Sequence, residues 1–248
     1  MSFKDHFSTQ SAIYRTARPR YAPGLFAWLA AQSPARALAW DAGCGTGQAS
    51  VGLAAEFARV VATDPSAAQI EQADAMPTID YRVERAEAST LDDGSADLVT
   101  VAQALHWFDL DAFHAEAIRV LRPGGVMAQW TYADCAITPP VDAVKQRLYA
   151  DVLETYWPAE RRLVESGYAT LAFPFRRIEA PTFDLVVQWD LAGFLAYLRS
   201  WSATQRYLKA VGRDPVDELA DAFAAAWGDV EQVRTVRWDL ALRVGVRD

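Results

Sequence analysis

An apolar segment runs directly into a turn that contains three glycines, and a helix-forming segment follows at once. The stretch ALAWDAGCGTGQASVGLA spans residues 37–54, with glycines at positions 43, 45 and 47. It predicts a strand over 37–40 and a helix over 49–57, whose small side chains allow close packing on a sheet. Glycine lets the backbone approach a ligand closely, and a helix start offers unpaired N–H groups. Alone, the pattern fits either a site for a polar or anionic ligand or a plain tight turn.

The following segments alternate between strand and helix patterns. Strands are predicted at 60–63, 80–85, within 95–105 and at 126–132, and helices at 66–75 and 111–121. The RPGG stretch at 122–125 is expected to stop the second of these helices. Such alternation predicts an α/β fold with a parallel sheet and helices on both faces.

The second half of the chain is mainly helical in pattern and rich in aromatic residues. Helices are expected within 139–170 and 190–228, and strands within 183–191 and 233–246. Apolar residues recur at helical spacing in three stripes, which most often indicates core packing: Val141, Val144, Leu148 and Val152; Leu191, Phe194, Leu198 and Trp201; Leu219, Phe223 and Trp227. The buried face of the 233–246 strand stays ambiguous, because apolar residues and arginines fall on both sides of its alternation.

Composition narrows the classes of partner. The 248 residues suit one α/β domain, and their formal net charge of −8 argues against nucleic acid, whose phosphates need clustered cations. No apolar run has the length of a signal peptide or a membrane span. The three histidines form no zinc signature. We therefore expect a cytoplasmic protein with reduced thiols, a small-molecule substrate, no metal and no membrane association.

Spacing weighs against a dinucleotide site. The fingerprint G-x-G-x-x-G requires a third glycine where this chain has Gln48 or Ser50. Asp64, at the predicted end of the next strand, is placed to accept hydrogen bonds from both hydroxyls of a ribose. Alone, an acidic residue before Pro65 is more often a helix cap. Combined with the glycine turn one strand earlier, Asp64 favours a nucleoside-containing ligand.

On these residues, the sequence resembles the class I S-adenosylmethionine-dependent methyltransferases. It is most similar to the small-molecule type 11 group, which includes trans-aconitate and ubiquinone or menaquinone biosynthesis methyltransferases. The motifs DAGCGTGQAS, VVATDPS, RAEASTLDDGSADLVTVAQALHWFD and EAIRVLRPGGVMAQW carry the resemblance, over about residues 10–132. It implies a Rossmann-like seven-stranded sheet with helices on both faces and helical insertions that form a substrate lid. It also implies S-adenosyl-L-methionine as cofactor and S-adenosyl-L-homocysteine as product.

The resemblance implies a single methyltransferase domain over residues 1–248. Its parts are cofactor-covering helices at 1–34, a cofactor-binding core at 35–135, helical lid insertions at 136–175 and 190–228, and the last strands at 176–189 and 229–248.

The resemblance also assigns roles to single residues. The methionine end of the cofactor is assigned to Asp41, Ala42, Gly43 and Gly45, with Tyr14 and Arg18 covering its carboxylate. The ribose diol is assigned to Asp64, with Pro65 beside the adenine, and the adenine amino group to Ala86 and Glu87. The sulfonium region is assigned to Gln103 and Ala104.

Methyl transfer depends on alignment of the nucleophile, the carbon and the sulfur more than on a dedicated base. A carboxylate acceptor needs no base, whereas a phenol, an amine or an activated carbon can need one. His106 is the candidate base, with packing beside Trp107 as the alternative. Trp107 and Trp130 are the candidate substrate-pocket residues.

The roles of the residues in the helical insertions stay open. Trp157 and Trp201 are placed to fold over the pocket or to pack in the core. Four arginines either bind a substrate carboxylate or face solvent: Arg161, Arg162, Arg199 and Arg206.

Two other classes of function also stay open. An NAD-dependent oxidoreductase is disfavoured by the missing third glycine and by the lack of a Tyr-x-x-x-Lys pair. A non-catalytic cofactor-binding module is compatible with the same glycine turn, because binding and turnover are separable.

Overall fold

The computed structural model describes residues 19–248, which are built around a seven-stranded sheet in the order β3-β2-β1-β4-β5-β10-β7. The strands are β1 Leu38–Ala42, β2 Arg59–Asp64, β3 Ile79–Val83, β4 Ala96–Ala102, β5 Leu121–Thr131, β7 Arg176–Ile178 and β10 Ala241–Val246. The first five in the order are parallel, whereas β10 runs antiparallel to β5 and to β7. The predicted Rossmann-like sheet is confirmed.

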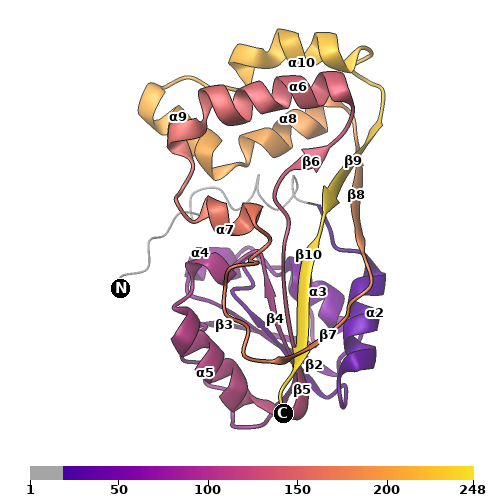
Figure 1. The fold of residues 1–248 in the computed structure, drawn as a ribbon, viewed down its shortest axis with the longest axis vertical. Coiled ribbons are helices and arrows are strands. Elements are labelled where there is room, and N and C mark those ends of the chain that lie inside the picture. The colour runs from indigo at the N-terminus through magenta and orange to yellow at the C-terminus, as the bar shows by residue number, and fades with distance from the viewer. Residues whose placement is uncertain (1–18) are drawn as a thin grey trace.

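Helices cover both faces of this sheet (Figure 1). The flanking helices are α2 Pro23–Gln32, α3 Gln48–Ala54, α4 Ala67–Ile70 and α5 Leu110–Val120. The side chain of Asp109 caps α5 by accepting a hydrogen bond from the Ala112 N–H at 3.3 Å. The prediction of a helix over 66–75 was too long, because the amides of Gln72 and Ala73 bond to carbonyls three residues back and the chain tightens into turns before Pro77.

A second sheet, absent from the sequence prediction, has three antiparallel strands in the order β6-β9-β8. Its strands are β6 Cys135–Ala136, β8 Asp184–Trp189 and β9 Arg234–Asp239. The single strand predicted over 233–246 is therefore wrong, since Leu240 separates β9 from β10 and each belongs to a different sheet. Val236 and Trp238 are the buried residues of β9, which resolves its facing.

A helical layer lies beyond the carboxyl ends of the parallel strands (Figure 1). It contains α6 Pro139–Gln146, α8 Leu191–Arg199, α9 Ser202–Val211 and α10 Ala220–Trp227. Helix α6 continues directly into a π-helical segment, Arg147–Val152, and a 3-10 turn, Glu154–Tyr156, whereas α7 Arg161–Glu165 lies between the layer and the sheet (Figure 1). Pro158 interrupts the helical pattern there, since proline lacks the N–H that a helix interior requires.

The helical layer and one face of the sheet share a continuous core. Leu29 and Leu53 from the sheet's flanking helices belong to the same buried cluster as Phe194 and Trp227 of the layer. A second buried cluster, with Trp40 and Phe113, fills the opposite face beneath α5. The stripe predicted at Leu191, Phe194, Leu198 and Trp201 is buried, as core packing requires.

The sheet contains one point at which the direction of strand progression reverses. From β1 the chain continues to β2 and β3 on one side, and then returns to place β4 and β5 on the other. Asp41 of β1 consequently lies beside both Ala62 of β2 and Thr100 of β4. In open α/β sheets, ligands bind outside the carboxyl ends of strands at such a switch point.

Candidate active site

The glycine turn leaves the carboxyl end of β1 and enters α3. All three glycines have positive φ, at 69°, 55° and 82° for Gly43, Gly45 and Gly47. A Cβ on Gly43 would lie 2.7 Å from the Ala104 Cβ, and a Cβ on Gly47 would lie 2.3 Å from the Tyr81 hydroxyl. Among the described residues, the nearest atom to a Cβ on Gly45 would be Gln69 Oε1, at an ordinary contact distance of 3.8 Å. Gly43 and Gly47 are thus closely packed, whereas Gly45 has room for a side-chain atom.

Asp64 lies at the end of β2 and is hydrogen-bonded to the turn. Its Oδ2 accepts a hydrogen bond from the Gly45 N–H at 2.9 Å, and its Oδ1 accepts one from the Ser66 N–H at 2.9 Å. The carboxylate therefore lies directly beside the uncrowded backbone of Gly45, as the sequence predicts for neighbouring strand ends.

Asp41 is placed differently from its predicted role at the methionine end. Its side chain is fully buried and accepts hydrogen bonds from the Ser50 hydroxyl at 2.6 Å and the Thr100 hydroxyl at 3.0 Å. Burial raises the pKa of this carboxyl to about 6, against the lowering effect of the two hydroxyls. Asp41 connects α3 to β4 beneath the turn, so its side chain does not face the open side of the turn.

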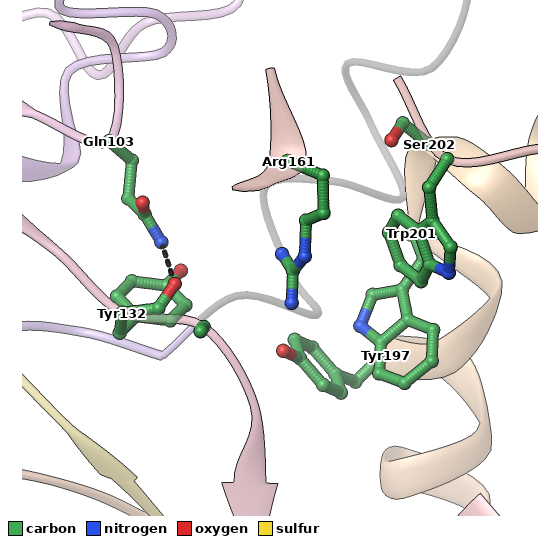
Figure 2. A pocket seen from close by; sticks show the side chains of 8 residues that line it. Gln103, Tyr132, Arg161, Tyr197, Trp201 and Ser202 are labelled. Atoms are coloured by element: carbon green, nitrogen blue, oxygen red, sulfur yellow. Dashed lines mark hydrogen bonds between the residues drawn. The ribbon is translucent and has the colours of Figure 1, made fainter. Parts of the chain in front are cut away.

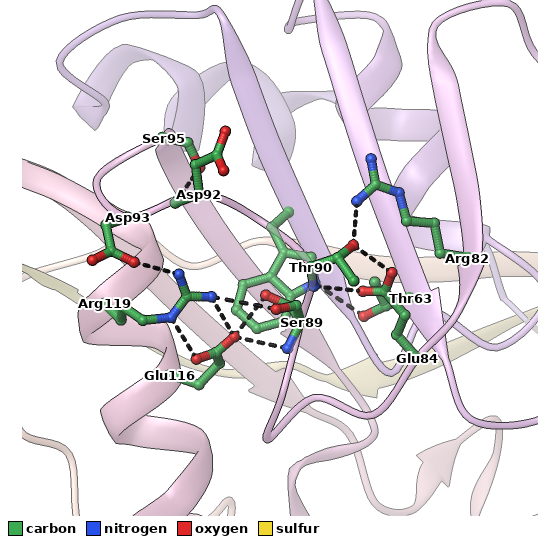
Figure 3. Close-up of polar contacts among 11 residues, drawn as sticks. Thr63, Arg82, Glu84, Ser89, Thr90, Asp92, Asp93, Ser95, Glu116 and Arg119 are labelled. Atoms are coloured by element: carbon green, nitrogen blue, oxygen red, sulfur yellow. Dashed lines mark hydrogen bonds and ion pairs between the residues drawn. The ribbon is translucent and has the colours of Figure 1, made fainter.

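The loop after β3, residues 84–95, contains the predicted adenine-contacting pair. Ala86 is buried, and Glu87 accepts a hydrogen bond from the Asp109 N–H at 3.0 Å and one from Arg85 at 3.2 Å. A polar cluster secures the rest of this loop to the body of the protein (Figure 3). The Ser89 amide and hydroxyl both donate to Glu116 at 2.7 Å, and Arg119 pairs with Glu116 at 2.7 Å.

Gln103 follows β4 in a backbone conformation that is unusual for its residue type. Its φ is 58°, which is uncommon outside glycine and is typical of strained functional positions. Its Nε2 donates to the Tyr132 carbonyl at 2.8 Å, and its Oε1 accepts from the Thr131 hydroxyl. Ala104, the next residue, packs against the glycine turn at Gly43. The Gln103 amide is therefore oriented by two bonds to the end of β5.

A small cavity of about 50 Å³ separates the end of β4 from the helical layer (Figure 2). Its described lining comes from the segments after β4 and β5, from α7, α8 and α9, and from the connections that precede α7 and α9: Gln103, Tyr132, Ala133, Trp157, Arg161, Tyr197, Trp201 and Ser202. Four of these residues are aromatic and one is cationic. Drug-sized ligands occupy roughly 300–1,000 Å³, so this volume holds one small functional group rather than a whole acceptor.

His106 lies in a short 3-10 turn, Leu105–Trp107, and does not line the cavity. Its Nδ1 is 2.8 Å from the Tyr168 hydroxyl, and its ring lies 4.7 Å from that of Trp107. Burial, and secondarily the positive charge of Arg161, lowers the pKa of His106 to about 3. The imidazole is therefore neutral and weakly basic, which favours the packing alternative over the base that we considered from sequence.

The low pKa of His106 predicts a pH-dependent contribution to stability. The unfolded chain protonates this imidazole near pH 6.5, whereas the folded protein does so only near pH 3. Between these values the unfolded state binds more protons, so stability falls as the pH falls through this window. We expect about 2–3 kcal/mol of this acid sensitivity at pH 4.5 to disappear in His106→Gln. Urea unfolding of both proteins at pH 7 and 4.5 measures it; parallel losses of stability would contradict the assignment.

The predicted substrate-pocket tryptophans do not line the cavity. Trp107 lies against His106. Trp130 is fully buried and packs edge-on against Tyr21 at 5.4 Å and Phe26 at 6.4 Å. Trp130 lies outside the cavity because strand alternation directs its side chain into the core beneath α2, and β5 continues through Thr131 before the chain reaches the cavity at Tyr132. Tyr14 and Arg18 lie outside the described residues.

The cavity also brings together residues that the sequence reading did not single out. Tyr132, Tyr197 and Ser202 line the cavity, and none of them was a site candidate from the sequence. Trp157 and Trp201, which were left open, both line the cavity, and so does Arg161 among the four candidate arginines.

Within residues 19–248, no group of His, Cys, Asp and Glu side chains is arranged to hold a metal ion. None of the helices there combines the length and the apolar character needed to cross a membrane.

Comparison with known proteins shows the family to which this chain belongs. Residues 40–128 match the family model described as a methyltransferase domain. A Dictyostelium discoideum protein whose name describes it as a methyltransferase is 34% identical over 229 residues, covering 91% of this chain and 87% of that protein. A solved structure from Anaeromyxobacter dehalogenans, described as a type II methyltransferase, is 49% identical with a TM-score of 0.87, covering 93% of this chain and 98% of that one. The chain therefore belongs to the class I S-adenosylmethionine-dependent methyltransferases, for which S-adenosylmethionine is the methyl donor.

Proposed function

We propose that the chain transfers the methyl group of S-adenosylmethionine to a carboxylate oxygen of a small-molecule acceptor. The observation that carries this proposal is the chemistry of the cavity lining, which among the described residues contains no His, Asp, Glu, Lys or Cys. An acceptor that is already anionic reacts without a general base. The neutral, weakly basic state of His106 supports the same reading.

The room beside the Gly45 backbone supports a cofactor site at these strand ends. This backbone is uncrowded, whereas Gly43 and Gly47 are packed against side chains, and the Asp64 carboxylate lies next to it. When bound, S-adenosylmethionine supplies the methyl carbon, which bonds to the acceptor oxygen as its bond to sulfur breaks and the electron pair stays on sulfur. The tight turn and the loop after β3 form the edge that receives the rest of the molecule.

At this edge of the sheet we propose the cofactor contacts that the family resemblance implies. Ala42 and Gly45 contact the methionine half of the cofactor. Asp64 binds the ribose diol, with Pro65 next to it, and the loop that contains Ala86 and Glu87 contacts the adenine. Gln103 and Ala104 lie at the sulfonium region, with Tyr14 and Arg18 assigned to the methionine carboxylate. We assign Asp41 a positioning role through Ser50 and Thr100 in place of direct contact, because its side chain is buried.

Charge and thiol chemistry support a small-molecule acceptor in the cytoplasm. The net charge of −8 disfavours a nucleic-acid substrate. Cys44 and Cys135 are both buried free thiols, which fits a reducing compartment.

Calorimetric titration with S-adenosylhomocysteine, with NAD as the comparison ligand, tests the cofactor. We expect binding of S-adenosylhomocysteine only; no binding below millimolar concentration would refute the proposal. Incubation with methyl-labelled S-adenosylmethionine and a metabolite extract then tests the acceptor. A carboxylate acceptor gives a methyl ester, so the label is released as methanol by mild base. Label held in base-stable products would refute the carboxylate assignment while leaving the methyltransferase activity intact.

A further inference from the structure

Arg161 is held at one end of its side chain only. Its Nε donates to the Tyr149 hydroxyl at 3.1 Å and lies 3.6 Å from Glu165 Oε1. The guanidinium stacks over the ring of Trp157 at 4.8 Å and lies 5.5 Å from that of Tyr149. Neither terminal nitrogen, Nη1 nor Nη2, donates a hydrogen bond to a described residue, because the Arg161 hydrogen bond is made by Nε. The side chain is 18% exposed, and it lines the cavity (Figure 2).

The other three candidate arginines lie away from the cavity. Arg199 pairs with Asp214 at 2.7 Å and with Asp217 at 2.6 Å. Arg162 is exposed, and Arg206 donates to the Tyr156 carbonyl at 3.4 Å. None of these three lines the cavity. Of the four candidates from the sequence, Arg161 is therefore the one directed at the space between the strand ends and the helical layer.

The other polar groups of the cavity are donors that complement Arg161. An amide carries two N–H groups, and Gln103 commits one of them to the Tyr132 carbonyl. The Ser202 hydroxyl also borders the cavity. No carboxylate is among the described residues that line the cavity, and Glu165 pairs with Arg161 through Nε at 3.6 Å, outside this lining. A cation and N–H and O–H donors at the cavity favour an oxyanion, and the planar guanidinium matches a carboxylate bidentately.

The aromatic walls indicate what the anion is attached to. The ring centroids of Trp157 and Trp201 are 5.5 Å apart, and those of Tyr197 and Trp201 are 5.8 Å apart. All three side chains line the cavity together with Tyr132. Aromatic side chains bind planar or apolar groups through their faces and edges. A polar, multiply charged acceptor would leave most of its polar groups against these rings without hydrogen bonds, which is unfavourable.

We infer that Arg161 determines acceptor specificity by binding the carboxylate of an aromatic or apolar monocarboxylic acid between itself and Gln103. This inference rests on the proposed function, and it adds the recognition residue and the class of acid. Both Arg161 and Gln103 border the same cavity of about 50 Å³, which accommodates a group the size of one or two waters. Methylation converts the carboxylate into a neutral ester, which weakens its pairing with Arg161 and favours product release.

The test uses the full chain and compares Arg161→Gln, Arg161→Lys and the matched control Arg162→Gln, whose exposed side chain is on the same short helix. Each protein is assayed with benzoate, cinnamate, phenylacetate and octanoate, and with their primary amides, for transfer of labelled methyl. We expect methyl esters from at least one acid and from no amide. Arg161→Gln should raise KM for that acid about 100-fold, with Arg161→Lys intermediate and Arg162→Gln unchanged.

Binding of S-adenosylhomocysteine separates this inference from the proposed function. We expect all three variants to bind it within about twofold of the unmodified chain, which also shows that they are folded. An Arg161→Gln protein that binds S-adenosylhomocysteine and keeps its KM for the acid would overturn the inference. So would methylation of the amides, or failure to methylate any of the acids by a chain that binds S-adenosylhomocysteine. Failure of the unmodified chain to bind S-adenosylhomocysteine would instead overturn the proposed function.

Discussion

Asp64→Ala is expected to weaken S-adenosylhomocysteine binding by at least about tenfold, as the loss of charged hydrogen bonds predicts. Two effects combine. The substitution removes the proposed acceptor for the ribose diol, and it also removes the carboxylate that accepts from the Gly45 and Ser66 amides at 2.9 Å each. Calorimetric titration measures the loss. Asp92→Ala is the matched control, because Asp92 is an exposed carboxylate on the 84–95 loop.

A nucleoside analogue distinguishes the two effects of Asp64→Ala. The 2′-deoxy form of S-adenosylhomocysteine lacks one of the hydroxyls that Asp64 is proposed to bind. We expect the unmodified chain to bind this analogue more weakly than the parent compound, and Asp64→Ala to bind the two equally, as a double-mutant cycle requires for a direct contact. Equal discrimination in both proteins would limit Asp64 to holding the turn and would refute the ribose assignment.

Gly45→Ala and Gly43→Ala are expected to differ in how much they reduce the stability of the fold. A Cβ at Gly45 meets nothing within 3.8 Å, so the variant should fold with a stability loss of about 1–2 kcal/mol from its positive φ. A Cβ at Gly43 would lie 2.7 Å from Ala104 and 2.8 Å from Phe108, so that variant should lose about 3 kcal/mol or more. Guanidinium unfolding measures both losses.

Cofactor binding completes the comparison of the two glycines. Because the added methyl group of Gly45→Ala projects into the proposed cofactor space, we expect at least about tenfold weaker S-adenosylhomocysteine binding in a protein that is still folded. If Gly45→Ala binds normally, the open space beside Gly45 is not the cofactor space. A greater loss of stability in Gly45→Ala than in Gly43→Ala would contradict the packing described for the turn.

Much of the sheet could be predicted because its signals are local. The strand predicted at 60–63 lies within β2, the one at 126–132 overlaps β5 up to Thr131, and the amphipathic helix predicted at 111–121 matches α5 within one residue at each end. Strand β9 and strand β10 were merged because their shared alternation gives no sign of a change of sheet. Their separation depends on pairing with β8 and β5, which are distant in sequence.

The candidate site was predictable to a similar extent. Gly43, Gly45, Asp64 and Gln103 follow strand ends, and parallel strands bring such ends to one edge. The side-chain directions of Asp41 and Trp130 were not predictable in this way. Asp41 turns inward to the hydroxyls of Ser50 and Thr100, and Trp130 packs with Tyr21 and Phe26, so both depend on partners that only folding supplies.

Periodicity therefore determined the fold class, and glycine spacing with an acid after a strand favoured a nucleoside-containing ligand, because each acts on neighbouring residues of the backbone, while the cofactor itself was implied by the family resemblance. Only the tertiary structure decided which arginine faces the strand ends and whether a base stands beside it. Arg161 and Gln103 border the same cavity because α7 packs through Val164 against the core cluster beneath α5, while burial beside Tyr168 leaves His106 neutral. Those relations depend on packing between distant segments, and local pattern carries no information about it.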